Sequence, residues 1–198
     1  LLYQCARYVD IYKALDDISR ERKLTPEERQ EQKLYSKLAD SLTPLAKGMN
    51  SEYCNQNTYD AIQIHGGSGF MLDYPIQRYY RDARITSIYE GTTQLQVVAA
   101  IRYVTNGSYL AQMREFEQAE VSEEMRPLQE KAKVMADKFE EAVEHVKNAA
   151  DQPLHDLCAR HLVEMAADII MLHLLLHNAN ADADHGEGDP LDLLRDVA

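Results

Sequence analysis

The chain has 198 residues, of which 45% are hydrophobic and 27% are charged, a composition typical of soluble globular proteins and unlike that of disordered chains. Its 33 acidic residues outnumber its 21 lysines and arginines, and the net charge of −12 disfavours nucleic acid as a partner, because a field of that sign repels phosphate backbones. No apolar run approaches the roughly 20 residues that a membrane span requires. The nearest run, Ile169 to Leu176, is interrupted by His173.

The first helix is predicted from Leu1 to Ile18, where apolar residues recur at helical spacing. A second begins at Thr25-Pro26, an N-cap followed by a first-turn proline, with glutamates placed for a capping box. We expect that helix to break at Ser41 to Pro44, and the helix after it to end at Gly66-Gly67.

An irregular stretch is expected from 66 to 75, then a short helix from Ile76 to about Arg84 and a further break at 87–91. Thr92-Thr93 could cap another helix, which ends near Asn106-Gly107. Two long amphipathic helices follow, from Pro127 to about Ala149 and from about 151 onward. Residues 178–189 are predicted to form an acidic loop, and Asp189-Pro190 to begin one more helix.

This pattern predicts an all-α, up-down helical bundle, since no alternating strand pattern of convincing length occurs. We place the domain boundary near Gly107, which gives domains of residues 1–107 and 108–198. The sequence begins without Met and inside a helix-like pattern, so we interpret it as a piece of a longer protein; a short protein whose first residues were trimmed is the alternative.

The three cysteines, Cys5, Cys54 and Cys158, are far apart and form no CxxC pattern. Such cysteine usage indicates a reducing compartment, so we expect a cytoplasmic location, and it predicts neither a disulfide framework nor a zinc site. His173 and His177 share a helix face but have no evident acidic third ligand, so no metal is predicted.

Unusual residues gather between 63 and 96, in the segments QIHGGSGF (63–70) and DYPIQRYYRDARITSIYEGTTQLQ (73–96). In order and spacing these segments resemble the C-terminal signature of acyl-CoA dehydrogenases, strongly from Gln63 to Gln96 and weakly over the rest of 1–104. The helices after Gly107 resemble, more weakly, the C-terminal extension of longer bacterial members of that superfamily.

The resemblance implies that Glu90 is the base that removes the α-proton of an acyl-CoA thioester while the β-hydrogen leaves as hydride to FAD. Such a carboxylate must be positioned and partly desolvated. The resemblance also implies that the backbone N–H of Glu90 is one donor to the thioester oxygen. Gly91 suits a tight backbone beside a flat ligand, so Glu90 and Gly91 are the predicted substrate contacts. The alternative is an exposed glutamate that is favoured by a neighbouring helix N-terminus.

The same resemblance implies that Thr92 and Gln94 contact FAD, with Thr92 near the pyrophosphate at a helix N-terminus. Thr92 could equally be a plain N-cap. The resemblance further implies that Gln63, Gly66, Gly67 and Gly69 approach the adenosine half of FAD in a neighbouring subunit. The protein would then be a homo-oligomer, a dimer or a tetramer, with shared sites. The alternative is a helix C-cap followed by a turn. For Arg81, Asp82 and Arg84, a salt bridge that holds the loop before Glu90 is the favoured interpretation, and His65 is expected to pack or cap.

The leading hypothesis is therefore an FAD-dependent acyl-CoA dehydrogenase that passes electrons to an electron-transfer flavoprotein. An acyl-CoA oxidase or a DNA-repair-associated flavoprotein on the same scaffold is the second possibility, and a non-catalytic helical oligomerisation module is the third. Because the domains that would surround the flavin in such an enzyme are absent from these 198 residues, we expect the isolated chain to be inactive.

Overall fold

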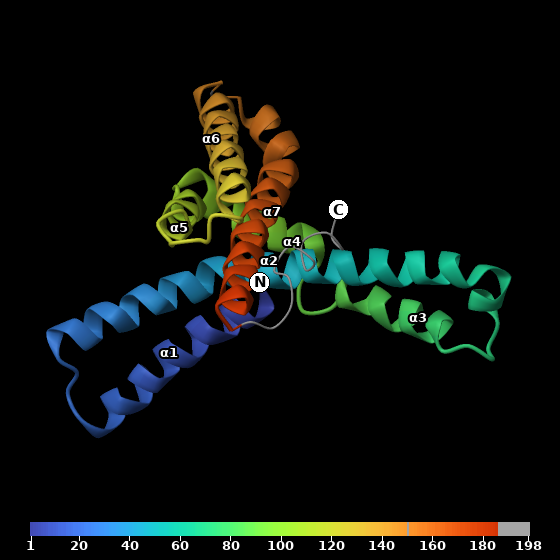
Figure 1. Ribbon diagram of the computed structural model, residues 1–198, viewed down its shortest axis with the longest axis horizontal. Coiled ribbons are helices and arrows are strands. Elements are labelled where there is room, and N and C mark those ends of the chain that lie inside the picture. Colours follow the sequence, from blue (N-terminus) through green and yellow to red (C-terminus); the bar gives the residue numbers. More distant parts are fainter. Residues whose placement is uncertain (150, 186–198) are drawn as a thin grey trace. The chain divides into compact units, whose positions relative to one another are not determined.

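The computed structural model describes residues 1–149 and 151–185 (Figure 1). These residues form seven α helices and one short 3₁₀ helix, and contain no strand. The predicted all-α fold is therefore confirmed. Contacts divide the chain into two compact units, Leu1–Ala100 and Ile101–Ala198. This division falls a few residues before the boundary that was placed near Gly107, and whether the units are independent domains stays a prediction.

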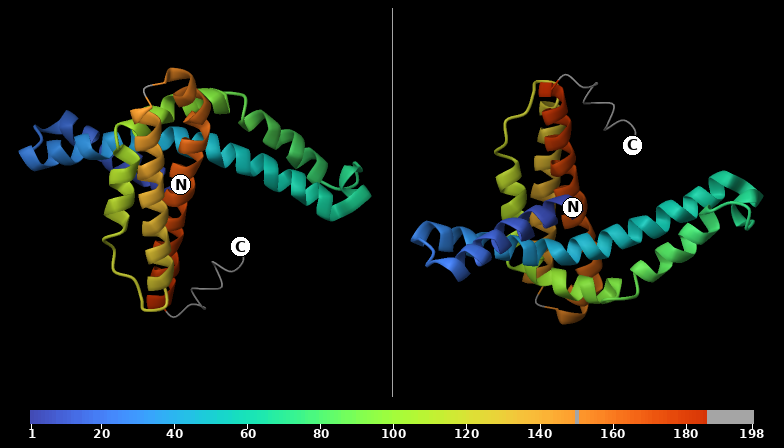
Figure 2. Two further views of the ribbon diagram at one scale, coloured as in Figure 1. Left: turned by 90° about the horizontal axis from the view of Figure 1, so that it is seen from above. Right: turned by 90° about the horizontal axis from the view of Figure 1, so that it is seen from below.

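Unit 1 is organised around one long helix, α2 (Pro26–His65). Helix α1 (Leu2–Glu21) packs along its N-terminal half, while the 3₁₀ helix η1 (Gly66–Phe70) and α3 (Ile76–Thr86) turn back along its C-terminal half (Figures 1 and 2). The core of the unit lies near the middle of α2, where Leu42 and Leu45 are completely buried. The unit also contains the first turns of α4 (Thr93–Thr105).

The start of α2 forms as the sequence predicts. The Thr25 hydroxyl accepts a hydrogen bond from the Glu28 N–H at 3.2 Å, and the Glu28 carboxylate accepts one from the Thr25 N–H at 2.9 Å. Arg22 donates to both oxygens of the same carboxylate, at 2.6 and 2.8 Å. These hydrogen bonds, first from Arg22 and then from Thr25, lower the pKa of Glu28 to about 2.

The expected break at Ser41 to Pro44 is wrong, because α2 continues through Pro44 without interruption. Proline removes one helical hydrogen bond, but Pro44 lies between the fully buried Leu42 and Leu45, and burial of this segment favours the helix. The hydroxyls of Ser41 and Thr43, which suggested a break, instead donate to the helix carbonyls of Leu38 and Ala39. One continuous element therefore carries every residue from 26 to 65.

Unit 2 contains α5 (Ser108–Phe116), α6 (Arg126–Asn148) and α7 (Gln152–His185). Helices α6 and α7 lie side by side, and α5 packs on both (Figures 1 and 2). Both long helices confirm the prediction, whereas α5 was missed, since nine residues give too short a pattern to detect. The predicted loop at 178–189 is wrong as far as His185: Leu176 and Ala179 are buried against Met125 and Ala132, and this packing continues the helix. The helix start predicted at Asp189-Pro190 lies outside the described residues.

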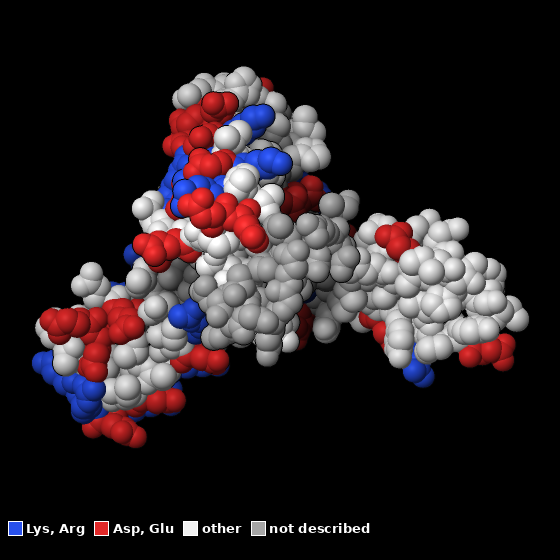
Figure 3. Space-filling model, in the orientation of Figure 1, with Lys and Arg blue, Asp and Glu red and all other residues white. Residues whose placement is uncertain are grey.

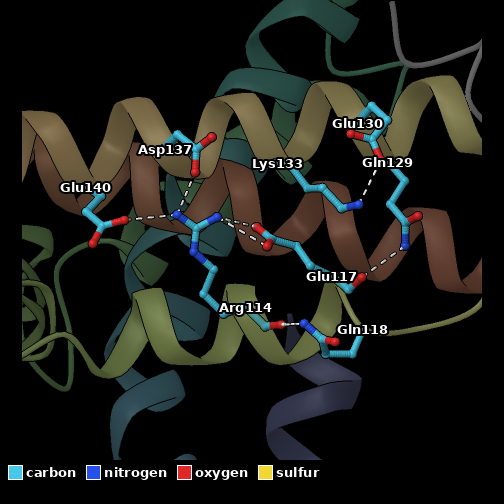
Figure 4. Close-up of polar contacts among 8 residues, drawn as sticks. All are labelled: Arg114, Glu117, Gln118, Gln129, Glu130, Lys133, Asp137 and Glu140. Atoms are coloured by element: carbon cyan, nitrogen blue, oxygen red, sulfur yellow. Dashed lines mark hydrogen bonds and ion pairs between the residues drawn. The ribbon is translucent and has the colours of Figure 1, made fainter.

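A polar network joins α5 to α6 (Figure 4). The Arg114 guanidinium donates to Asp137 at 2.6 Å and to Glu140 at 2.9 Å on α6, and to Glu117 at 3.0 Å just after α5. These contacts, chiefly the hydrogen bond with Asp137, raise the pKa of Arg114. The Gln129 amide, also on α6, donates to the Ala119 carbonyl at 2.8 Å and fixes the chain that leaves α5.

Within α7, residues Gln152–Ala181 are long and apolar enough to cross a membrane by length and composition alone, with a mean hydropathy of 1.4. Half of the most apolar stretch is buried inside the protein. The apolar character of this 34-residue helix thus extends beyond the eight-residue run at 169–176.

A histidine lies in the core of unit 2. His173 on α7 is 1% exposed, packs beside the Phe116 ring at 6.0 Å between ring centres, and has no hydrogen-bond partner for Nε2 among the described residues. Burial, with a smaller contribution from the neighbouring His177, lowers the pKa of His173 to about 4.

Unit 2 should therefore lose stability as the pH falls. Above the unfolded-state pKa of about 6.5, His173 is neutral in both the folded and the unfolded chain. As the pH drops towards 4, only the unfolded chain takes up the proton, and the free energy of unfolding falls by about 3 kcal/mol. Urea unfolding followed by circular dichroism across this range should show that His173→Gln removes that part of the pH dependence. The exposed His161→Gln should keep it, and equal pH dependence in the two variants would contradict the assignment.

Candidate active site

The loop between α3 and α4 carries Glu90 in an unusual backbone conformation. Glu90 has a φ of +52°, in the left-handed region that non-glycine residues occupy at a cost of about 1–3 kcal/mol, and Gly91 follows with a φ of +96°. This φ favours glycine at position 91; a Cβ there would also displace the Gln96 amide, whose Nε2 would lie 2.7 Å away.

Helix α4 begins directly after this loop. The Thr92 hydroxyl accepts from the Leu95 N–H at 3.4 Å, so Thr92 caps the helix as predicted. In the part of the chain that the structure describes, the N–H groups of Glu90, Gly91 and Thr92 donate to no other residue. Consecutive unpaired N–H groups at a helix N-terminus favour a negatively charged or electron-rich ligand.

Side chains from α2 and α4 hold the loop from below. Lys47 Nζ donates to the carbonyls of Thr86 at 2.7 Å and Gly91 at 2.8 Å, and Gln96 Nε2 also donates to Gly91, at 3.3 Å. Farther along α2, the Glu52 carboxylate accepts from the Thr93 hydroxyl at 2.5 Å. Sequence reasoning missed Lys47 and Glu52, because they lie about 40 residues from the loop and belong to no local motif.

Glu90 opens onto a shallow groove of about 250 Å³, lined mainly by α2, with Leu2 of α1, the end of α3 and the loop itself. Lys47 and Cys54 on α2 line the groove, together with Thr86, Tyr89 and Glu90. The Glu90 side chain is exposed, so the partial desolvation expected of a base is not provided by the described residues.

The glycine-rich segment lies at the far end of α2. Gly66 ends the helix with a φ of +59°, and η1 then folds back so closely that a Cβ on Gly69 would lie 2.7 Å from the Ile62 carbonyl oxygen. The expected irregular stretch thus begins with a turn of 3₁₀ helix. Gly66 and Gly67 are exposed with open space around them, and Gln63 is also exposed.

The two groups of predicted site residues are well separated. Glu90, Gly91 and Thr92 lie together beside Lys47, and Gln94 is exposed in the first turn of α4. Gln63 lies sixteen residues beyond Lys47 on the same helix, which corresponds to about 24 Å. The structure does not bring Gln63, Gly66, Gly67 and Gly69 into one pocket with Glu90.

The predicted intrahelical or interhelical salt bridge of Arg81, Asp82 and Arg84 is wrong: none of the three forms an ion pair with any described residue. Arg81 and Arg84 lie one and two positions from Asp82 on α3, and neighbours at that spacing do not face each other. Arg84 instead donates to the Ser87 hydroxyl at 2.6 Å, which ties the end of α3 to the start of the loop.

His65 caps and packs, as expected: Nδ1 lies 2.9 Å from the Ala61 carbonyl oxygen and the ring meets the edge of Tyr74. Among the described residues no group of three or more His, Cys, Asp or Glu side chains could hold a metal ion.

Two protein families match the chain. Residues 27–103 match "Acyl-CoA dehydrogenase, C-terminal domain", and residues 105–187 match "Acyl-CoA dehydrogenase C terminal". The chain belongs to the acyl-CoA dehydrogenase family. The second match shows that the helices of unit 2 are also part of the acyl-CoA dehydrogenase C-terminal region, as the resemblance beyond Gly107 implied.

Curated relatives share short stretches with this chain. The broad-specificity linear acyl-CoA dehydrogenase FadE5 of Mycobacterium tuberculosis is 48% identical over 64 residues, which is 32% of this chain and 10% of FadE5. An acyl-CoA dehydrogenase of Bacillus subtilis is 42% identical over 64 residues, 32% of this chain and 17% of the relative.

A caffeyl-CoA reductase-Etf complex subunit, CarC of Acetobacterium woodii, is 50% identical over 52 residues, 26% of this chain and 14% of the subunit. The matched stretches thus span less than a fifth of each relative. The relatives include both dehydrogenases and reductases, so the chain belongs to a family of oxidoreductases.

The two glycines of η1 differ in what they tolerate. Gly69→Ala should destabilise unit 1 by about 1–3 kcal/mol, because its Cβ would overlap the Ile62 carbonyl. Gly67→Ala should change stability by less than about 0.5 kcal/mol, because nothing lies within 4 Å of its Cβ. Thermal unfolding of the two variants measures the difference, and equal stability would refute the close packing of η1 on α2.

Proposed function

We propose that the chain is the C-terminal part of an FAD-dependent acyl-CoA dehydrogenase, with Glu90 as the base that removes the substrate α-proton. The observation that carries this proposal is the Glu90 loop. It presents an exposed carboxylate in a left-handed conformation, followed by unpaired N–H groups at a helix N-terminus, and loop residues are rarely held in this way without a functional reason.

The proposed reaction needs two things from these residues. The Glu90 carboxylate accepts the weakly acidic proton on the α-carbon of the thioester. The Glu90 N–H, which has no acceptor among the described residues, donates to the thioester oxygen as negative charge develops there. Bound FAD would supply the acceptor for the hydride that leaves the β-carbon.

The residues proposed to hold FAD are compatible with such a ligand. Thr92 and Gln94 are exposed at the N-terminus of the 13-residue helix α4, whose dipole favours a pyrophosphate. Gln63, Gly66 and Gly67 are exposed at the end of α2, where the lack of side chains leaves the backbone open to a flat adenosine group. Gly69 acts indirectly, by allowing η1 to fold onto α2.

The separation of the two groups supports a homo-oligomer with shared sites. Since about 24 Å of α2 lies between Lys47 and Gln63, the glycine-rich end would meet the FAD of a second copy. The face drawn in Figure 3 shows few charged side chains over that end of unit 1. Three large apolar side chains are almost fully exposed there: Ile64 at 84%, Phe70 at 82% and Leu72 at 87%. Apolar surface of this kind indicates a protein contact.

The remaining parts of the proposal rest on the relatives and on composition. One relative is a subunit of a reductase-Etf complex, which supports an electron-transfer flavoprotein as redox partner. Free cysteines are compatible with a cytoplasmic location. The exposure of Glu90 implies that other parts of a longer protein complete the site, so the isolated chain should not turn over.

An acyl-CoA oxidase and a DNA-repair-associated flavoprotein remain alternatives on the same scaffold, and they differ in electron acceptor and ligand. A non-catalytic oligomerisation module is disfavoured, because such a module has no physical need for a strained, exposed carboxylate at position 90.

In the full-length protein, Glu90→Gln should lower turnover and α-proton exchange by about 10²–10⁴-fold while FAD stays bound, because the amide cannot accept the proton. Proton exchange is measured from deuterium uptake by the thioester, and FAD content from absorbance. Glu31→Gln, an exposed carboxylate on α2, is the matched control and should behave as the unmodified enzyme. Near-normal exchange in Glu90→Gln would contradict the assignment.

The oligomer proposal predicts that Leu72→Asp weakens self-association, because it places a charge on a surface that is buried between copies. Light scattering should show a smaller mass for this variant at low micromolar concentration. Leu157→Asp, at a residue that is 75% exposed in unit 2, should leave the mass unchanged. An unaltered mass for Leu72→Asp would rule out this end of α2 as the interface.

A further inference from the structure

We propose that Lys47 is the positioning residue that fixes the Glu90 loop in the conformation needed for proton abstraction; this inference rests on the proposed role of Glu90. The side chain lies beneath the loop. Its ammonium group bonds the last residue of α3 and the residue that follows Glu90. Lys47 would therefore act on the base through the backbone, not through contact with the thioester.

The two hydrogen bonds close the loop. Both the Thr86 and the Gly91 carbonyl oxygens lie within 2.8 Å of the same Nζ atom, so the two oxygens are no more than about 5.5 Å apart. The four residues between them, 87–90, therefore form a closed loop whose two ends are held together by Lys47. A charged donor makes each bond stronger than a neutral one, and Lys47 is mostly buried, which limits competition from water.

The closed loop explains how Glu90 keeps its left-handed backbone. Strained conformations persist only where the surroundings determine them more than once. Here the Gly91 carbonyl, next to the strained residue, accepts from both Lys47 and Gln96. The Lys47 ammonium also lies over the Tyr89 ring, 5.7 Å from its centre, so the residue before Glu90 is held as well.

Gly48, next to Lys47 on α2, allows α4 to approach α2 closely. At Gly48, a Cβ would lie 3.1 Å from Cβ of Gln96, a closer approach than most side chains permit. The absence of a side chain at 48 lets α4 lie near enough to α2 for Lys47 and Gln96 to share one carbonyl acceptor. Lys47 thus donates the hydrogen bonds, and Gly48, which has no side chain, leaves the space that α4 needs.

The inference is tested in the full-length FAD-bound enzyme with Lys47→Met, which keeps the length of the side chain but removes the donors. We expect kcat to fall about 10–100-fold, because a small displacement of a catalytic group costs that much, while KM changes little. Straight-chain acyl-CoA thioesters of short, medium and long chain are tried, and the best substrate is used. Lys37→Met, an exposed lysine on the same helix, is the matched control.

Amide hydrogen exchange gives a readout that does not depend on the substrate. In Lys47→Met, exchange should quicken at least about tenfold at the hydrogen-bonded loop amides of Ile88, Tyr89 and Thr93, and stay unchanged in α1 and in unit 2. Lys47→Arg keeps a charged donor and should restore both the slow exchange and most of kcat. If Lys47→Met proves unfolded, Lys47→Gln is measured in its place, since it retains a neutral donor and should show an intermediate effect.

A kcat within about twofold of normal, or unchanged exchange at Ile88, Tyr89 and Thr93, would overturn the role of Lys47 even if Glu90→Gln is inactive. If Glu90→Gln is instead active, the proposed function fails, and with it the role given to Lys47. The two failures are therefore distinguishable.

Discussion

Helix α2 runs unbroken for 40 residues past an internal proline, and α1, η1 and α3 all pack against it. Its middle is buried strongly enough to keep Pro44 helical, and this continuity fixes the distances along unit 1. A break at residues 41–44 would have divided α2 into two helices, and Lys47 would have belonged to the second. Because there is none, one rigid element supports the loop that carries Glu90 and ends at the glycine-rich turn.

This arrangement gives the proposed site two ends. One end holds Glu90 over Lys47, beside the N-terminus of α4, and the other presents exposed glycines and large apolar side chains. A separation of about 24 Å along a single helix cannot be closed by small side-chain movements. This separation supports the proposal that the two ends contribute to sites shared between copies.

Local patterns predicted most of the helices. The capping box at Thr25, the helix ends at Gly66 and near Gly107, and the start of α4 all depend on residues within one turn of each other. The errors arose where packing between distant residues decided the outcome. Pro44 stays helical because of its buried neighbours, and α7 continues past Asn178 because Leu176 and Ala179 are buried.

The site follows the same division. Glu90, Gly91 and Thr92 belong to a contiguous motif and could be named from the sequence, including the need for glycine at 91. Lys47, Glu52 and Gly48 could not, since each acts through a contact across more than 40 residues or through an absent side chain. The motif identifies the residue that we propose as the base, and the packing explains what holds its loop.

The most direct test of the central claim is a crystal structure of the full-length protein with FAD and a non-reacting acyl-CoA analogue. The account predicts that the Glu90 carboxylate lies within about 4 Å of the analogue's α-carbon, with the Glu90 N–H bonded to the thioester oxygen. A different carboxylate at the α-carbon, with Glu90 facing solvent, would contradict it.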